Sequence, residues 1–110
     1  MAEYKKLFEL FFKAGKVMFD SENYTVAAEN FAKAIFVALD HIIEKKLGIP
    51  PSNHEKRKEI VELSFKQYVP ILKKVYKIHR RTYRNLVDRG AAEVLMEYAK
   101  KLGKEAGFFE

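Results

Sequence analysis

Cationic side chains recur at helical spacing between residues 66 and 84. Residues 54–89 hold eleven basic and four acidic side chains, whereas the segments on either side are close to neutral. Ammonium and guanidinium groups that share a surface bind phosphates by Coulomb attraction, and tyrosine rings stack on nucleobases. The pattern therefore predicts a surface that binds nucleotides or nucleic-acid phosphates. Its predicted contact residues are Lys73, Lys77, Arg80, Arg81, Tyr83 and Arg84.

Most of these cations share one face of a single helix only if the helical phase runs through Pro70 without a break. A solvated helix face is the alternative interpretation, because runs of charge often do nothing more than face water. No motif that reads a base sequence accompanies this row of cations, so we expect its binding to be unselective and sensitive to salt. The predicted row consists of Lys66, Lys73, Lys77, Arg80 and Arg84.

The three histidines are candidates for acid–base chemistry. His79 lies five residues before Arg84, so a general acid or base could stand beside a cation that stabilises a phosphate. The alternative is a partly buried His79 that hydrogen-bonds a backbone or tyrosine group. His54 is predicted on the surface at a helix start, and His41 is predicted as a packed histidine beside Asp40. None of them has a partner at metal-ligand spacing, so the sequence predicts neither a metal site nor a cofactor.

Composition limits the class of protein. The chain has 110 residues, of which 48% are hydrophobic and 14% aromatic, and it has no cysteine. This length and apolar content are typical of one folded domain, here residues 1–110. The lack of cysteine excludes a disulfide scaffold and a thiol nucleophile, and it fits a cytoplasmic setting. The scarcity of Asn and Gln beside abundant Lys and Glu hints at a thermophile.

The sequence predicts no insertion into a membrane. Charged residues interrupt the apolar residues of the N-terminal segment, which therefore does not resemble a secretory signal. The longest uncharged apolar run, residues 34–39, is far shorter than the roughly 20 residues that a membrane-spanning helix needs. We expect a protein that stays in solution.

Apolar spacing predicts two long helices in the first half of the chain. The first runs from about Ala2 to Phe19, and the polar residues 20–23 form a turn. The second runs from about Tyr24 to Leu47 and is apolar over most of its girth, which predicts a central position in the fold. Gly48 can end this helix in a left-handed conformation, and the two prolines that follow prevent its continuation.

Two further helices are predicted between residues 54 and 87. The first starts at His54, behind a capping box formed by Ser52 and Glu55. Pro70 predicts either a kink or a fresh helix start, because proline cannot donate a hydrogen bond to the preceding turn. The helix that passes or begins at Pro70 then continues to about Val87.

The last helix is predicted from Ala91 to about Leu102, and Gly90 separates it from the preceding one. Phe108 and Phe109 then dock either on their own bundle or on a second subunit, because two exposed rings at a chain end would be a liability. No window shows the alternation of a strand. The sequence thus predicts an all-α fold, an antiparallel up-and-down helical bundle of four main helices and a short fifth segment.

Residues 22–34 read Glu-Asn-Tyr-Thr-Val-Ala-Ala-Glu-Asn-Phe-Ala-Lys-Ala and open the long second helix, which ends at Leu47-Gly48. This hairpin resembles that of the HEPN family (higher eukaryotes and prokaryotes nucleotide-binding domains), and the last helix is similar to the closing helix of that family. The resemblance covers nearly the whole chain in helix order and length. It implies a homodimer that binds nucleotide or RNA, and a nucleotidyltransferase partner as in toxin–antitoxin pairs.

The ribonucleases of that family carry an Arg, often followed by Asn, with a His a few residues further on. Arg84-Asn85 matches the first part of this motif, but the positions for the His hold Arg89, Gly90 and Ala91. The resemblance therefore implies a non-catalytic binding module. A divergent ribonuclease that uses His79 and Arg84 remains the alternative.

A helical module for protein interaction is a further alternative. Several small and apolar residues fit the spacing of a single tetratricopeptide repeat. Leu39 stands where that repeat would place its closing proline, and no second copy follows. The residues that fit are Gly15, Tyr24, Ala27, Phe31 and Ala34.

Overall fold

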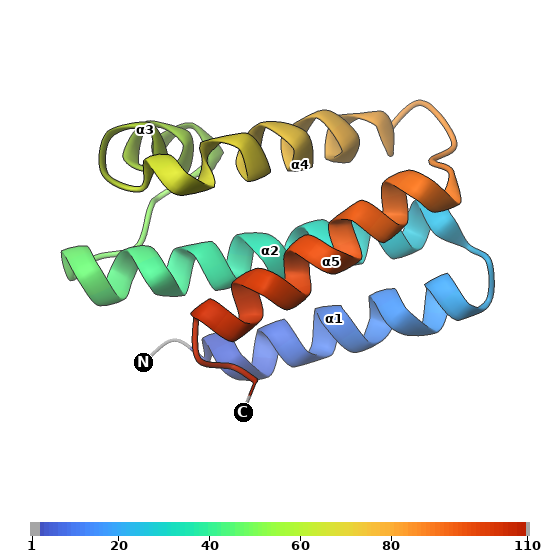
Figure 1. The fold of residues 1–110 in the computed structure, drawn as a ribbon, viewed down its shortest axis with the longest axis horizontal. Helices are drawn as coiled ribbons and strands as arrows, with labels where there is room; N and C mark the ends of the chain where they lie inside the picture. Colours follow the sequence, from blue (N-terminus) through green and yellow to red (C-terminus); the bar gives the residue numbers. More distant parts are fainter. Residues whose placement is uncertain (1–2, 110) are drawn as a thin grey trace.

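The computed structural model describes residues 3–109 and contains only helices and their connections in that range (Figure 1). The all-α antiparallel bundle predicted from the sequence is confirmed. The predicted helix start at Ala2 lies outside the described residues. The elements are α1 (Tyr4–Asp20), α2 (Tyr24–Leu47), α3 (His54–Ser64), the 3-10 turn η1 (Lys66–Tyr68), α4 (Val69–Arg81) and α5 (Arg89–Glu105).

The long helix α2 is the centre of the fold, as its wide apolar girth predicted. It packs against α1 and against α5, which crosses it in Figure 1, while α4 lies along the opposite edge of the molecule from α1. Phe31, Ile35 and Leu39 on α2 have no exposed surface. Even so, within residues 3–109 no helix is long and apolar enough to cross a lipid bilayer.

Two glycines allow the helices around α2 to approach closely. A Cβ atom at Gly15 on α1 would lie 2.5 Å from the Cε1 atom of Phe31, far inside van der Waals distance. Gly103 on α5 lies in the same way against the rings of Phe8 and Phe109. The aromatic rings of the core therefore fill the space that side chains at these two positions would occupy.

The helix starts differ from the sequence prediction in their capping residues. Asn53, rather than the predicted Ser52, caps α3: its Oδ1 atom accepts a hydrogen bond from the backbone N–H of Lys56 at 2.8 Å. Asp88 caps α5 in the same manner, so Gly90 lies inside the first turn of that helix rather than before it. Asn and Asp side chains accept the hydrogen bond at the N-cap of a helix as well as Ser does, so either can take this position.

Pro70 begins a fresh helix, one of the two outcomes predicted for it. It stands in the first turn of α4, where no intrahelical donor is required. The short turn η1 precedes it and separates the phases of α3 and α4. Tyr68 in this turn donates a hydrogen bond from its hydroxyl to the carboxylate of Glu105 at 2.7 Å, which fastens the start of α4 to the end of α5.

Helix α4 ends at Arg81 rather than at the predicted Val87. The Thr82 hydroxyl shares its one proton between two acceptors, the carbonyl of His79 at 2.6 Å and the carboxylate of Glu29 at 2.8 Å. The backbone N–H of Val87 donates to the Thr25 hydroxyl at 2.8 Å, and the Val87 side chain is buried. These bonds to α2 require the chain to leave the helix after Arg81.

The C-terminal aromatic pair docks on its own chain, one of the two predicted outcomes. Phe108 is buried, with its ring centroid 5.2 Å from that of Phe8 and 5.0 Å from that of His41. Phe109 packs on the edges of Phe8 and Phe12. Gly107 adopts a left-handed conformation with φ of 82° and makes the turn that returns these rings to the bundle.

Replacing Gly15 by alanine tests the close packing of α1 on α2. The new methyl group meets the ring of Phe31, so we expect Gly15→Ala to lower the free energy of unfolding by about 1–3 kcal/mol. Gly90→Ala is the matched control, because the nearest atom to a Cβ there is 3.7 Å away and alanine favours helices. Urea unfolding followed by circular dichroism measures both. Equal stability of the two variants would contradict this account of the packing.

Candidate functional site

The guanidinium of Arg57 joins three helices at one buried point. Its Nε and Nη2 atoms donate to both carboxylate oxygens of Asp40 on α2, at 2.7 and 2.9 Å. Its plane lies 4.8 Å from the ring centroid of Phe36, in a cation–π contact. The remaining nitrogen, Nη1, contacts Nδ1 of His54 and the hydroxyl of Tyr76 on α4. Arg57 thus holds α3 on α2 and aligns α3 with α4.

Two histidines lie next to this centre, with ring centroids 6.3 Å apart. Because arginine only donates hydrogen bonds, Nδ1 of His54 must accept, and the ring is neutral with its proton on Nε2. His79 is buried, its Nε2 atom lies 3.3 Å from the hydroxyl of Tyr83, and its Nδ1 atom has no hydrogen-bond partner. The pair therefore presents two uncharged imidazoles.

Both imidazoles favour the neutral form, although His79 is buried and His54 is exposed. Desolvation lowers the pKa of His54 below its usual value, and the charge of Arg57 lowers this pKa further. Desolvation also lowers the pKa of His79, although the nearby carboxylate of Glu29 offsets part of that effect. Neither imidazole is therefore protonated to a large extent at neutral pH.

The predictions for the three histidines have different outcomes. The alternative of a partly buried His79 that bonds a tyrosine hydroxyl is confirmed. His41 is packed between the rings of Tyr4 and Phe108, as predicted. His54 begins α3 and is exposed, as predicted. Its contact with Arg57 could not be predicted, because that contact depends on how α3 packs on α2.

A basic groove lies between α3 and α4, with a volume of about 560 Å³. Its floor is made of aromatic rings, and its rim is made of cations, with Glu55 as the single acidic side chain that lines it. Lys58 on α3 is a rim residue that the sequence did not single out, because only the packing of α3 beside α4 brings it there. The rim consists of Lys58, Lys73, Lys77 and Arg80; the floor consists of His54, Tyr76, His79 and Tyr83.

The predicted contact residues divide between the groove and its surroundings. Lys73, Lys77, Arg80 and Tyr83 line the groove, whereas Arg81 and Arg84 do not. The row of five cations on one helix is wrong in its extent, because η1 precedes α4 and α4 ends at Arg81. Lys66 and Arg84 therefore lie outside α4. No hydrogen bond or ion pair within residues 3–109 joins the candidate catalytic pair of His79 and Arg84.

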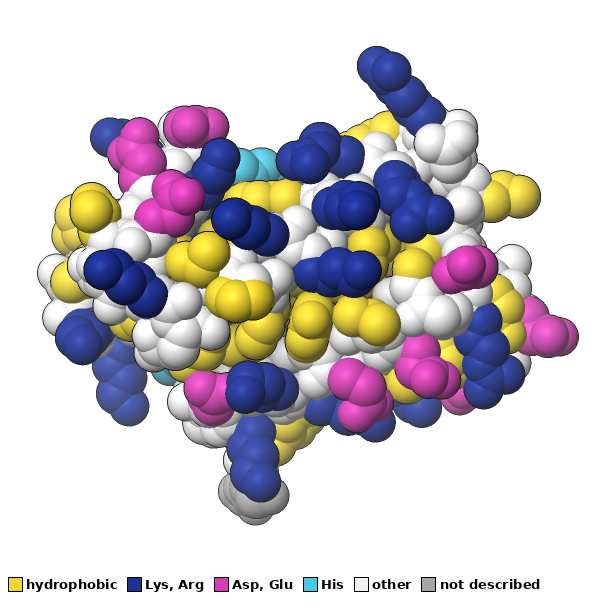
Figure 2. Space-filling view, turned by 45° about the horizontal axis from the view of Figure 1, so that its top comes forward, with side chains coloured by type: hydrophobic (Ala, Val, Ile, Leu, Met, Phe, Trp, Pro, Cys, Tyr) yellow, Lys and Arg dark blue, Asp and Glu magenta, His cyan; other side chains and the backbone are white. Residues whose placement is uncertain are grey.

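Within residues 3–109, none of the cations that line this groove forms an ion pair with an acidic side chain. Elsewhere in residues 3–109 the ion pairs are mostly between neighbours on one helix, such as Lys100 with Glu97. Figure 2 shows a group of Lys and Arg side chains over the upper middle of the molecule, without acidic side chains among them; acidic side chains lie at the upper left, at the right and along the lower edge, where further Lys and Arg side chains also lie. The cations on α3, α4 and the following turn without an ion pair are Lys58, Lys73, Lys74, Lys77, Arg80, Arg81 and Arg84.

A second hollow, which we call the aromatic pocket, lies over α2 and has a volume of about 450 Å³. Phe11, Phe36 and Val37 line it together with side chains of both charges. His54, His79 and Tyr83 belong to both the aromatic pocket and the basic groove, so they form the wall that the two hollows share.

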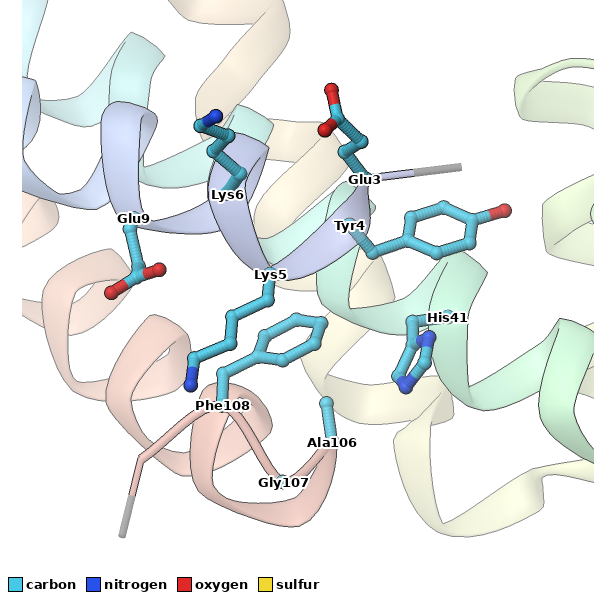
Figure 3. A pocket seen from close by; sticks show the side chains of 9 residues that line it. All are labelled: Glu3, Tyr4, Lys5, Lys6, Glu9, His41, Ala106, Gly107 and Phe108. Atoms are coloured by element: carbon cyan, nitrogen blue, oxygen red, sulfur yellow. The ribbon is translucent and has the colours of Figure 1, made fainter. Parts of the chain in front are cut away.

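A third hollow, of about 680 Å³, lies between the start of α1 and the C-terminal turn (Figure 3). The ring of Phe108 occupies its interior beside Lys5 and His41, whereas Glu3 and Lys6 point away from that ring. Burial, together with nearby Glu44, raises the pKa of Tyr4 to about 12, so this phenol stays protonated. Mixed charges and a docked phenyl ring make this hollow a packing feature of the chain ends.

Comparison with known proteins adds no family to these observations. No protein-family model, no curated protein and no solved structure matches the chain. The resemblance to HEPN domains therefore stays a prediction from the sequence. Within residues 3–109, no group of three or more His, Asp or Glu side chains is placed to hold a metal ion.

The buried ion pair predicts a large loss of stability when one partner is removed. Arg57→Ala leaves the Asp40 carboxylate without its donors, so we expect the free energy of unfolding to fall by about 3–5 kcal/mol. Arg89→Ala is the control, because its pair with Glu93 is exposed and is expected to contribute less than about 1 kcal/mol. Urea unfolding of both variants tests this. A small loss in Arg57→Ala would rule out the structural role of the pair.

Acidification is expected to destabilise the fold through the two neutral imidazoles. A histidine whose pKa is lower in the folded than in the unfolded protein stabilises the fold above the unfolded value, near 6.5. That contribution disappears as the pH falls through the folded pKa. The free energy of unfolding should therefore drop as the pH falls below about 6.5, and His54→Gln should show a shallower drop. Unfolding curves across this range, with His41→Gln as control, measure the difference; parallel curves for all three proteins would contradict it.

Proposed function

We propose that the protein is a non-catalytic binding module for nucleotides or nucleic-acid phosphates and that the ligand binds in the basic groove. The observation that carries this proposal is the set of rim cations without acidic partners around an aromatic floor. Anionic ligands neutralise such a rim, and phosphates are the anions that accompany aromatic bases in the cell. Arg81 and Arg84, outside the groove, add to the positive field that attracts the ligand.

The geometry of α4 supports binding of successive phosphates. Lys73, Lys77 and Arg80 are spaced four and three residues apart, so they follow one face of the helix. Lys58 faces them from α3 across the groove. A chain of phosphates that follows the groove therefore has cations on both sides.

The resemblance to HEPN domains supports the same class of ligand. It adds a homodimer and a nucleotidyltransferase partner, and we include both in the proposal. In such a pair this chain would be the helical member. If the binding experiment below finds no ligand, it will favour the alternative of a protein-interaction module without affinity for nucleic acid.

A divergent ribonuclease is the second candidate, because two neutral imidazoles line the groove. One neutral imidazole can remove the proton of a ribose 2′-hydroxyl. The other must first gain a proton before it can donate to the leaving 5′-oxygen, so this reaction would be favoured below neutral pH, where one of the two imidazoles is protonated. This reaction would leave a 2′,3′-cyclic phosphate and a free 5′-hydroxyl. The ring centroids of His54 and His79 are 6.3 Å apart, so in this candidate the two histidines share the reaction in place of His79 and Arg84.

Binding of fluorescently labelled single-stranded RNA and labelled ATP tests the proposed function. We expect binding that weakens steeply across a salt series, because each phosphate contact releases condensed counterions. Reversing two rim charges, Lys77→Glu and Arg80→Glu together, should weaken binding by about tenfold or more. The control reverses Lys100 and Lys101 on α5, which lie outside the groove. Absence of binding at low salt, or equal loss in both variants, would refute the proposal.

Gel analysis of the same RNA mixtures separates a binding module from an enzyme. A binding module leaves the RNA intact. Cleavage that disappears in both His54→Ala and His79→Ala would establish the ribonuclease instead. Cleavage that persists in these variants would come from a contaminating nuclease.

A further inference from the structure

The aromatic pocket extends the basic groove towards α2. The wall between the two consists of His54, His79 and Tyr83, and Phe11, Phe36 and Val37 also line the pocket. The rings of this wall pack edge to face: His79 lies 5.5 Å from Phe36 and 5.4 Å from Tyr83 between centroids. Five aromatic rings therefore surround one hollow beside the cationic rim.

The two hollows differ in charge. Cations dominate the rim of the basic groove, whereas the aromatic pocket has two carboxylates, Glu29 and Asp40, besides Lys33 and Arg57. Arg57 and Asp40 neutralise each other. A phosphate in the aromatic pocket would meet the carboxylate of Glu29, whereas an uncharged heteroaromatic ring would meet aromatic faces and a polar edge.

The polar edge offers both an acceptor and a donor. Glu29 accepts a hydrogen bond from Thr82 with Oε2, which leaves Oε1 as an acceptor. Lys33, one helical turn further along α2, lies 5.7 Å from the ring centroid of Phe11 and forms no ion pair within the described residues. Every nucleobase has both donors and acceptors on its edges, so a base suits this pair better than a purely apolar ring does.

His79 in the shared wall carries an unusual energetic penalty. Its side chain is only 9% exposed, and its Nδ1 atom has no hydrogen-bond partner. Unpartnered buried polar atoms are rare in folded proteins and concentrate where function constrains the side chain.

We infer that the ligand is a nucleoside phosphate whose base is unpaired and that it spans both hollows. This inference rests on the proposed function. Its phosphates lie on the rim of the basic groove, its base enters the aromatic pocket, and Tyr83 at the boundary stacks on the base or its sugar. The base is thus required for full affinity. A free mononucleotide and a nucleotide within a single strand share this chemistry, whereas a duplex offers only its phosphates because its bases are paired and stacked.

Comparing ATP with inorganic tripolyphosphate tests the inference on the native protein. Stacking of one base contributes about tenfold or more to affinity, so we expect ATP to bind at least about tenfold more tightly than tripolyphosphate. Single-stranded RNA should likewise compete better than duplex RNA of the same length. Isothermal titration calorimetry gives the affinities without a label.

Filling the aromatic pocket tests which hollow holds the base. Val37→Trp places an indole in the pocket and leaves the basic rim intact, so ATP affinity should fall to that of tripolyphosphate, whose affinity should not change. Val26→Trp is the control, because Val26 lies on the same helix, is exposed, and lines neither hollow. Val37→Phe provides a smaller filling if the larger one disturbs the fold, which circular dichroism detects.

The outcomes separate this inference from the proposed function. Equal binding of ATP and tripolyphosphate by the native protein would overturn the base pocket and leave the phosphate-binding function in place. Failure of every anion to bind would overturn both. Unchanged ATP affinity in folded Val37→Trp would also overturn the base pocket. If ATP binds but RNA does not, the ligand is a mononucleotide; if both bind, the pocket also accepts single strands.

Discussion

The arrangement of α2, α3 and α4 depends on the guanidinium of Arg57, because this group of α3 contacts both α2 and α4. Helix α3 buries only Arg57 and Val61, whereas α4 places Ile71, Leu72, Val75 and Ile78 in the core. Arg57 therefore supplies much of the attachment of α3, through its bidentate hydrogen bonds to Asp40, its cation–π contact with Phe36 and its contact with Tyr76. A buried ion pair of this kind fixes geometry even where its net contribution to stability is modest.

The same guanidinium determines the chemistry of the hollows beside it. Because Arg57 donates to His54, it imposes one tautomer on that ring and disfavours its protonation. The early end of α4 adds the second constraint. Thr82 and Val87 bond to side chains of α2, so Tyr83 is carried out of the helix and over His79. The wall between groove and pocket is thus a consequence of polar bonds to α2.

Local patterns predicted most of the helices, and contacts between distant residues account for the differences. The limits of α2 follow from Gly48 and the apolar girth of the helix, and Pro70 marks the start of α4. The end of α4 depends instead on a bond between Val87 and Thr25, which are 62 residues apart in sequence. No periodicity within residues 70–87 contains that information, so the predicted helix ran too far.

The candidate site divides in the same way. Lys73, Lys77 and Arg80 could be predicted, because helical spacing alone places them on one face. Lys58 and Phe36 could not, since they reach the site only through the packing of α3 and α2. The pairing of Arg57 with Asp40 also escaped prediction, because a single Arg and a single Asp on different helices have no spacing rule in common.

The cations of α4 also affect the stability of the helix that carries them. His79, Arg80 and Arg81 stand in its last turn, where positive charge complements the partial negative charge of the helix C-terminus. Lys73 and Lys77 have no such compensation, and like charges one turn apart destabilise a helix by about 0.2–0.5 kcal/mol for each pair. A bound anion removes this repulsion as well as adding its own attraction. An anion bound in the basic groove, as proposed, would therefore relieve a repulsion that α4 carries when it is alone.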